Sequence, residues 1–163
     1  MNTITSSLAA NSSAIVLHTR KGTDIDNFQT TELSAYDIKA AQELKKKYSM
    51  AEFRTNFIPI YNCHGMTFAS RRTAVFEGTE VRQILSEDEY EEIPLQQVSP
   101  GDVIIYVDER GDIEHSGVVI SKPAPPLNVP LVVSKWGKGP EVLHSAYYSP
   151  YSVSDIHFYR ITK

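Results

Sequence analysis

The spacing of hydrophobic positions changes along the chain, from helical in the first half to strand-like in the second. The clearest helical stretch extends from Leu33 to Tyr48, where apolar residues recur every three or four positions. Ser34 is a good N-cap at its start, and the lysines at 45–47 complement the negative end of a helix. The pattern therefore predicts a helix from Ser34 to the lysine run.

A second helix is predicted within residues 73–92, where four apolar residues follow helical spacing beside an acidic run: Val81, Ile84, Leu85 and Tyr90. Short apolar runs predict β-strands at 14–17, 103–107, 113–120 and 131–136, with shorter candidates at 142–144 and 156–161. The first of these runs indicates a buried strand. We expect one α+β domain over residues 1–163, with a loose start at 1–11.

The strands predicted at 113–120 and 131–136 are joined by a proline-rich loop, so an antiparallel pair should begin where Ile120 meets Leu131. Counting along both strands places His115 opposite Trp136. Ser134 then lies on the same face as His115, one step further in, and Lys135 faces the other side.

The chain contains a single cysteine, Cys63, which follows a good N-cap at Asn62 and precedes a short apolar helical pattern. A cysteine in the first turn of a helix faces backbone N–H groups that favour its thiolate, so we expect a lowered pKa and a nucleophilic sulfur. The same N–H groups could hold an oxyanion. The alternative is that Cys63 is a small buried hydrophobic residue.

Composition excludes several classes of function. A net charge of −4 and the lack of a basic stripe argue against a nucleic-acid partner, and no apolar run reaches the roughly 20 residues that cross a membrane. One cysteine cannot form an intrachain disulfide, and no Cys/His spacing indicates a zinc site, so neither a metal nor a cofactor is expected. The start of the chain lacks the features of a signal peptide, which predicts a cytoplasmic protein; export by a signal-independent system stays open.

Three short motifs follow one another along the chain: Asn62-Cys63-His64-Gly65-Met66-Thr67, Pro100-Gly101-Asp102 and His115-Ser116-Gly117-Val118-Val119. They resemble, in the same order, the Asp-Cys-Ser-Gly-Leu-Val, Pro-Gly-Asp and His-Val-Gly-Ile-Tyr motifs of NlpC-type papain-like cysteine peptidases. The segment Ser134-Lys135-Trp136-Gly137, with the later Pro150-Tyr151, looks like a bacterial branch related to CHAP-type amidases. The resemblance implies a cysteine-bearing helix packed on an antiparallel sheet that carries the histidine.

The resemblance also implies roles for particular residues. Cys63 would be the nucleophile and His115 its base, with Ser134 where the family places a third polar residue, often histidine. Lys135 and His144 remain alternatives for that third position. Three residues are candidates for oxyanion or substrate binding, at the cysteine motif and at the predicted strand end: Tyr61, His64 and Trp136.

The function that follows is a thiol peptidase or amidase that cleaves an amide bond in a peptide, a peptidoglycan fragment or a protein. The alternative is an inactive or acyl-transferring papain-like module that binds a protein partner. Neither reading predicts an oligomeric state.

Overall fold

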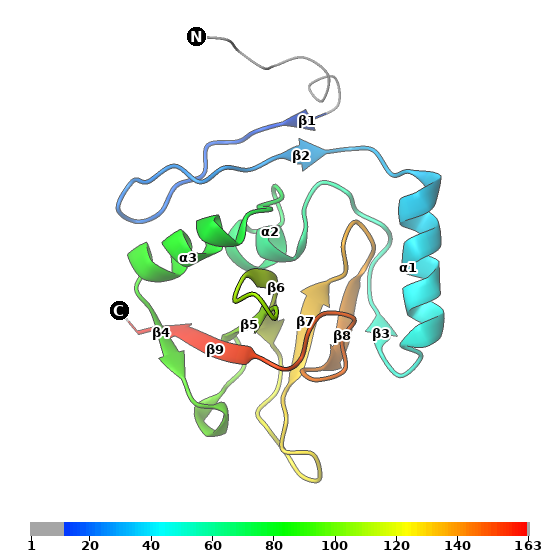
Figure 1. Ribbon diagram of the computed structural model, residues 1–163, viewed down its shortest axis with the longest axis vertical. Helices are drawn as coiled ribbons and strands as arrows, with labels where there is room; N and C mark the ends of the chain where they lie inside the picture. The colour runs from blue at the N-terminus through cyan, green and yellow to red at the C-terminus, as the bar shows by residue number, and fades with distance from the viewer. Residues whose placement is uncertain (1–11, 163) are drawn as a thin grey trace.

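The computed structural model describes residues 12–162, so the start expected to be loose, 1–11, lies outside the described residues. Its centre is a seven-stranded antiparallel sheet in the order β3-β8-β7-β6-β5-β9-β4 (Figure 1). A separate two-stranded sheet pairs β1 with β2. The strands are β1 Ser12–Ser13, β2 Gln29–Thr30, β3 Glu52–Phe53, β4 Tyr90–Ile93, β5 Val103–Val107, β6 Ile113–Val119, β7 Leu131–Lys135, β8 Glu141–Ser145 and β9 Ile156–Ile161.

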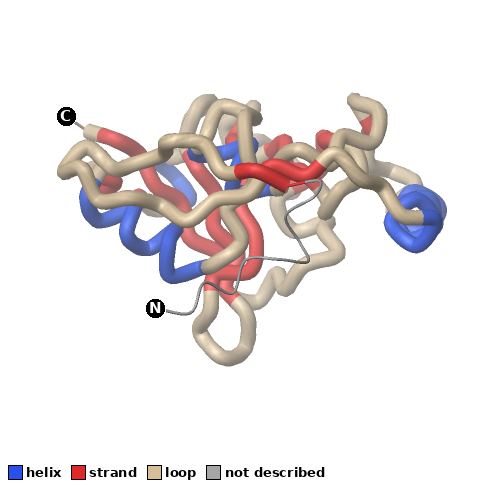
Figure 2. Tube along the Cα trace, turned by 90° about the horizontal axis from the view of Figure 1, so that it is seen from above, coloured by secondary structure: helices blue, strands red, loops and turns tan. Residues whose placement is uncertain are grey.

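Three α-helices accompany the sheet: α1 Ala35–Lys47, α2 Cys63–Phe68 and α3 Gly78–Glu87, with a short 3₁₀ helix at Leu95–Gln97. The predicted first helix is confirmed, because Ser34 caps α1 in a reciprocal pair of hydrogen bonds with Asp37. Figures 1 and 2 both place α1 at the end of the molecule away from α3, beside the β3 edge. The α+β class is confirmed.

Alternating side chains give the sheet two apolar faces, each with its own core. One core joins the β5 residues Ile104 and Tyr106 to Phe158 of β9, Val119 of β6 and Val132 of β7. The other places Val103, Ile105, Val107 and Ile113 against Val81 and Leu85 of α3. Because β5 is covered on both sides, all five of its residues are buried, as its continuous apolar run predicted.

The predicted pairing of β6 with β7 is confirmed. Gly117 pairs with Ser134, Val118 with Val133 and Val119 with Val132, which is the register counted from the proline-rich loop. The ladder ends at the Gly117–Ser134 pair, so β6 and β7 are no longer paired where His115 and Trp136 follow.

Two sequence predictions were wrong. Residues 14–17 are not a buried strand: the strand there is Ser12–Ser13, and Val16 is 82% exposed. The side chain of Asn27 takes the place of a strand partner, since it bonds both the N–H and the carbonyl oxygen of Ile15. The second helix ends at Glu87, and Tyr90 begins β4, where it pairs with Ile161.

Within residues 12–162, the structure contains no helix that is long and apolar enough to span a membrane.

Candidate active site around Cys63

Asn62 fixes the position of Cys63 at the first residue of α2. Its side-chain oxygen accepts hydrogen bonds from the N–H groups of Gly65 (2.9 Å) and Val75 (3.1 Å), and its amide donates to the carbonyl oxygen of Val75 (2.7 Å). The predicted N-cap is therefore confirmed, and the cap also ties α2 to the following extended segment. A side chain at Gly65 would collide with that segment, because a Cβ there would lie 1.8 Å from the carbonyl oxygen of Thr73.

Cys63 lines a pocket with a volume of about 260 Å³ at the start of α2. The wall contains two of the predicted substrate-binding residues, Tyr61 and His64, together with Glu114 of β6 and Tyr151 from the loop before β9. Gly137 and Lys138, in the loop after β7, complete this side. The cysteine is 7% exposed, so it lines the pocket with little contact with solvent.

The expected low pKa of Cys63 is wrong. Burial raises the pKa of the thiol to about 11, and the backbone N–H groups of Ser116, His64 and Cys63 itself and the charge of Lys135 offset only part of this effect. The short helix cannot compensate for the loss of solvent around the sulfur. At neutral pH the resting form is therefore the thiol, and a base is needed to generate the nucleophile.

His115 lies on β6, directly before the residue whose N–H interacts with the Cys63 sulfur. Its side chain is fully buried, and neither ring nitrogen has a hydrogen-bond partner among the described residues, so Cys63 and His115 are not hydrogen-bonded. The ring of Tyr151 stacks on the imidazole with centroids 3.7 Å apart and planes 9° apart. Burial keeps the pKa of His115 well below its usual value, with smaller contributions from His64 and His144, so the ring is neutral.

A chain of hydrogen bonds fixes the tautomer of His64. Thr67 donates its hydroxyl proton to the Cys63 carbonyl oxygen (2.9 Å), and Ser116 donates to the Thr67 hydroxyl (3.0 Å). The Ser116 oxygen must then accept the Nδ1–H of His64 (2.8 Å). Nε2 of this pocket residue is consequently unprotonated, and burial lowers the pKa of His64 to about 4, which keeps it so.

Ser134 does not hydrogen-bond to His115, although it lies on the predicted face. The Nδ1–H of His144 donates to the Ser145 carbonyl oxygen (2.8 Å), so Nε2 accepts the hydroxyl proton of Ser134 (2.7 Å). Trp136 donates its indole N–H to the same hydroxyl oxygen (3.1 Å). The assignment of Ser134 as the residue that orients His115 through a direct hydrogen bond is wrong, because these two partners already engage its hydroxyl.

The prediction that Trp136 contributes to oxyanion or substrate binding is also wrong. Trp136 does not line the Cys63 pocket, and its ring packs edge-on against Tyr48 and Phe53, with centroids 5.2 and 5.5 Å away. It is a core residue.

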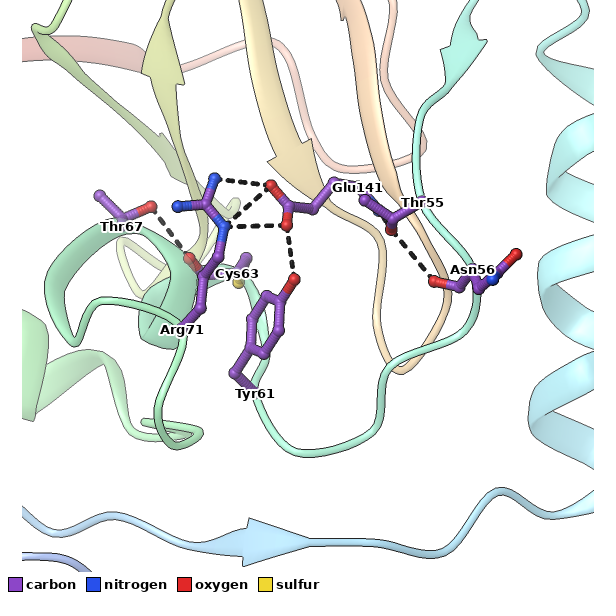
Figure 3. Close-up of polar contacts among 7 residues, drawn as sticks. All are labelled: Thr55, Asn56, Tyr61, Cys63, Thr67, Arg71 and Glu141. Carbon is purple, nitrogen blue, oxygen red and sulfur yellow. Dashed lines mark hydrogen bonds and ion pairs between the residues drawn. The ribbon is translucent and has the colours of Figure 1, made fainter.

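Figure 3 shows a second polar group beside Cys63, centred on the buried carboxylate of Glu141. Arg71 binds this carboxylate with two nitrogens, and the Tyr61 hydroxyl donates to it at 2.5 Å. The bond to Glu141 engages the proton that Tyr61 would need as an oxyanion donor, so the hydroxyl is not free for that role. Arg71 reaches Glu141 from a left-handed backbone conformation, with φ at 63°.

Lys135 faces the side of the sheet opposite His115, as predicted. Its fully buried ammonium group donates to the carbonyl oxygens of Gly137 (2.9 Å) and Gly139 (2.8 Å) and lies 4.9 Å from the Tyr61 ring centroid. Burial lowers the pKa of Lys135 to about 8, and the nearby Cys63 sulfur and Glu141 carboxylate offset only part of this effect. The lysine thus holds the loop that forms one wall of the pocket.

The structure brings Cys63, His64 and Tyr61 into one pocket and places His115 beneath Tyr151 at its side. The sequence analysis gave no role to Glu141 or Arg71, and it used Tyr151 only as part of the family resemblance. Glu141 could have been suspected, because an acidic residue opens the short apolar run of β8. Tyr151 carried no periodic signal, since it follows a Ser-Pro turn.

Within the described part of the chain, no group of three or more histidine, cysteine or acidic side chains is arranged to hold a metal ion. Comparisons of the sequence and the structure with family models, curated proteins and solved structures found no match.

Proposed function

We propose that the protein is a thiol hydrolase in which Cys63 attacks an amide carbonyl and His115 acts as its base. The observation that carries this proposal is a buried, neutral imidazole with both nitrogens unused, one residue from the N–H group that faces the Cys63 sulfur. Buried polar groups nearly always have a hydrogen-bond partner, so an unpartnered imidazole beside a cysteine-lined pocket is a candidate for proton transfer.

The proposed reaction has two steps. An unprotonated nitrogen of His115 takes the Sγ proton, the sulfur forms a bond to the carbonyl carbon, and the imidazolium then gives its proton to the leaving amine. Water hydrolyses the resulting thioester and restores the thiol. Because the Tyr151 ring holds the imidazole in place, the Cys63 side chain is the group that has to rotate to bring Sγ to a nitrogen of His115. The backbone N–H groups of Cys63 and His64 are available to the oxyanion.

The motifs of the sequence support an amide substrate, since they resemble those of NlpC-type and CHAP-type enzymes. We therefore propose a papain-like peptidase or amidase acting in the cytoplasm or after signal-independent export. Its substrate would be a peptide, a peptidoglycan fragment or a protein.

One observation favours the second candidate, a module that binds a partner without hydrolysis. The thiol of Cys63 has a raised pKa and the imidazole of His115 is covered by Tyr151, which is the condition of a closed, unreactive site. Thiol reactivity separates the two candidates.

The test is the rate at which iodoacetamide labels Cys63 at pH 7, read by intact mass, because the chain has no other cysteine. If His115 withdraws the proton, His115→Ala should slow labelling by at least about tenfold. His157→Ala is the matched control, since His157 lies on the surface in ion pairs with Glu92 and Asp155 and should label like the wild type.

Slow labelling that is the same with and without His115 contradicts the hydrolase and supports the binding module. For a reactive protein, wall fragments and cell proteins are then incubated with the wild type and with Cys63→Ala. Product masses that appear only with the wild type identify the bond that is cleaved.

A further inference from the structure

In the described part of the chain, the imidazole of His115 is held by ring contacts and not by a hydrogen bond. Catalytic histidines of the triad type are oriented by a third side chain bonded to the second ring nitrogen. None of the described residues bonds either nitrogen of His115. What contacts the ring instead is aromatic: Tyr151 stacked on one side, and Tyr106 tilted by 50° at a centroid distance of 5.3 Å.

Tyr151 is itself fixed from several directions. The N–H of Gly137, in the loop anchored by Lys135, interacts with its hydroxyl oxygen. Its own backbone N–H donates to the Ser149 hydroxyl at 3.2 Å. The next residue, Ser152, donates its backbone N–H to the Glu114 carboxylate at 2.5 Å. Because Glu114 precedes His115 on β6, the strand that carries the imidazole also holds the loop that covers it.

We propose that Tyr151 is the positioning residue of His115, and that ring stacking here does the work of a hydrogen-bonding third residue. The inference rests on the proposed thiol hydrolase function. It assigns the third position to the loop before β9, in place of Ser134, Lys135 or His144.

Stacking suits this role for two reasons. Rotation of the imidazole about its Cβ–Cγ bond would break a 9° alignment at 3.7 Å, so the ring plane is defined while both nitrogens stay free. Once His115 has taken the thiol proton, the imidazolium lies against the electron-rich face of a tyrosine, which favours the charged form. A third residue that hydrogen-bonds to the imidazole would occupy one of its nitrogens, whereas the stacked tyrosine ring occupies neither.

The test compares Tyr151→Phe, which keeps the ring, with Tyr151→Leu, which removes it. The readouts are the pH profile of iodoacetamide labelling of Cys63 and the proton shifts of the His115 ring, which the stacked tyrosine should move upfield. We expect Tyr151→Phe to label within about twofold of the wild type and Tyr151→Leu to lose about 3- to 10-fold, the range that corresponds to the loss of one aromatic pair. Tyr147→Leu, in the same loop but 45% exposed, is the matched control and should have no effect.

His115→Ala, measured beside these variants, distinguishes the two levels of the argument. Unchanged labelling in His115→Ala overturns the proposed function, and the positioning role with it. Slowed labelling in His115→Ala but wild-type labelling in folded Tyr151→Leu overturns the positioning role alone. If Tyr151→Leu does not fold, Glu114→Ala is used instead, because it removes the carboxylate that holds Ser152 and with it the Tyr151 loop. Wild-type labelling of Cys63 in Glu114→Ala also counts against the inference.

Discussion

His144 and His115 are both buried in the same sheet, yet their surroundings differ in kind. On β8, each nitrogen of His144 has a partner, and Ser134, Trp136 and Ser145 assign every proton. On β6, His115 has two stacked or tilted rings, and neither of its nitrogens has a hydrogen-bond partner within residues 12–162. A ring whose hydrogen bonds are complete contributes to stability, whereas a ring with free nitrogens costs stability and leaves those nitrogens available for chemistry.

The largest expected effect is acid sensitivity, which both histidines share with His64. Burial lowers the pKa of His64 and His144 to about 4 and that of His115 well below 6.5. Between these values and 6.5 the unfolded chain binds protons that the folded chain does not, so stability falls as the pH drops below 6.5. Each histidine should remove up to about 1.4 kcal/mol of unfolding free energy per pH unit in this window, and the three together up to about 4 kcal/mol per pH unit.

Urea midpoints at pH 7, 6 and 5 measure this loss. His157 acts in the opposite direction, because Glu92 raises its pKa, so the series is best run in a His157→Gln background. A midpoint that does not change between pH 7 and 5 would mean that the three rings are not buried in solution.

Replacing each histidine by phenylalanine tests directly whether the two sites differ in their contribution to stability. His144→Phe leaves the Ser134 hydroxyl proton without an acceptor and removes one of the two donors to the Ser145 carbonyl oxygen, so it should cost about 2–3 kcal/mol of unfolding free energy. His115→Phe keeps a planar ring in the stack and removes two unpaired nitrogens, so it should be neutral or should stabilise by up to about 1 kcal/mol. Denaturant unfolding measures both. Equal losses would show that the two sites are alike.

The smallest effect is expected for Ser134→Ala. It removes the hydroxyl between His144 and Trp136 and should cost about 1–2 kcal/mol in stability, again by denaturant unfolding. Cys63 labelling should stay close to wild type, because the hydroxyl does not bond His115. A loss of labelling larger than that of Tyr151→Leu would return Ser134 to the third position.

The comparison also marks what the sequence could predict. Local signals were sufficient for the Ser34 and Asn62 caps, for the buried run of β5 and for the register of β6 with β7, because each depends on residues close in the chain or on one short loop. The register of β6 with β7 predicted the face of the sheet on which Ser134 lies, but it did not predict the hydrogen-bond partners of the Ser134 hydroxyl. Those depend on His144, which enters from β8, and on rotamers that no periodic pattern encodes.

The wrong prediction for the Cys63 pKa has the same origin. A helix N-terminus can be inferred from four residues, whereas burial of the sulfur depends on β6 and on the loops that carry Gly137 and Tyr151, which meet at the pocket only in three dimensions. The role of Tyr151 was missed for this reason as well: its partner lies 36 positions earlier in the sequence (151 − 115).

The order of strands in the sheet has a consequence for synthesis. β9 is the last of the described strands, yet it lies inside the sheet, where it pairs with β5 on one side and β4 on the other. β4 leaves the ribosome long before its partner does, and the Tyr151 loop is made immediately before β9. Until then, one side of β5 is an open strand edge, the kind that attracts other unfinished chains. This edge is therefore open to pairing with other chains until β9 has been made, and the Tyr151 ring can stack on His115 only after β5 to β8 have been made.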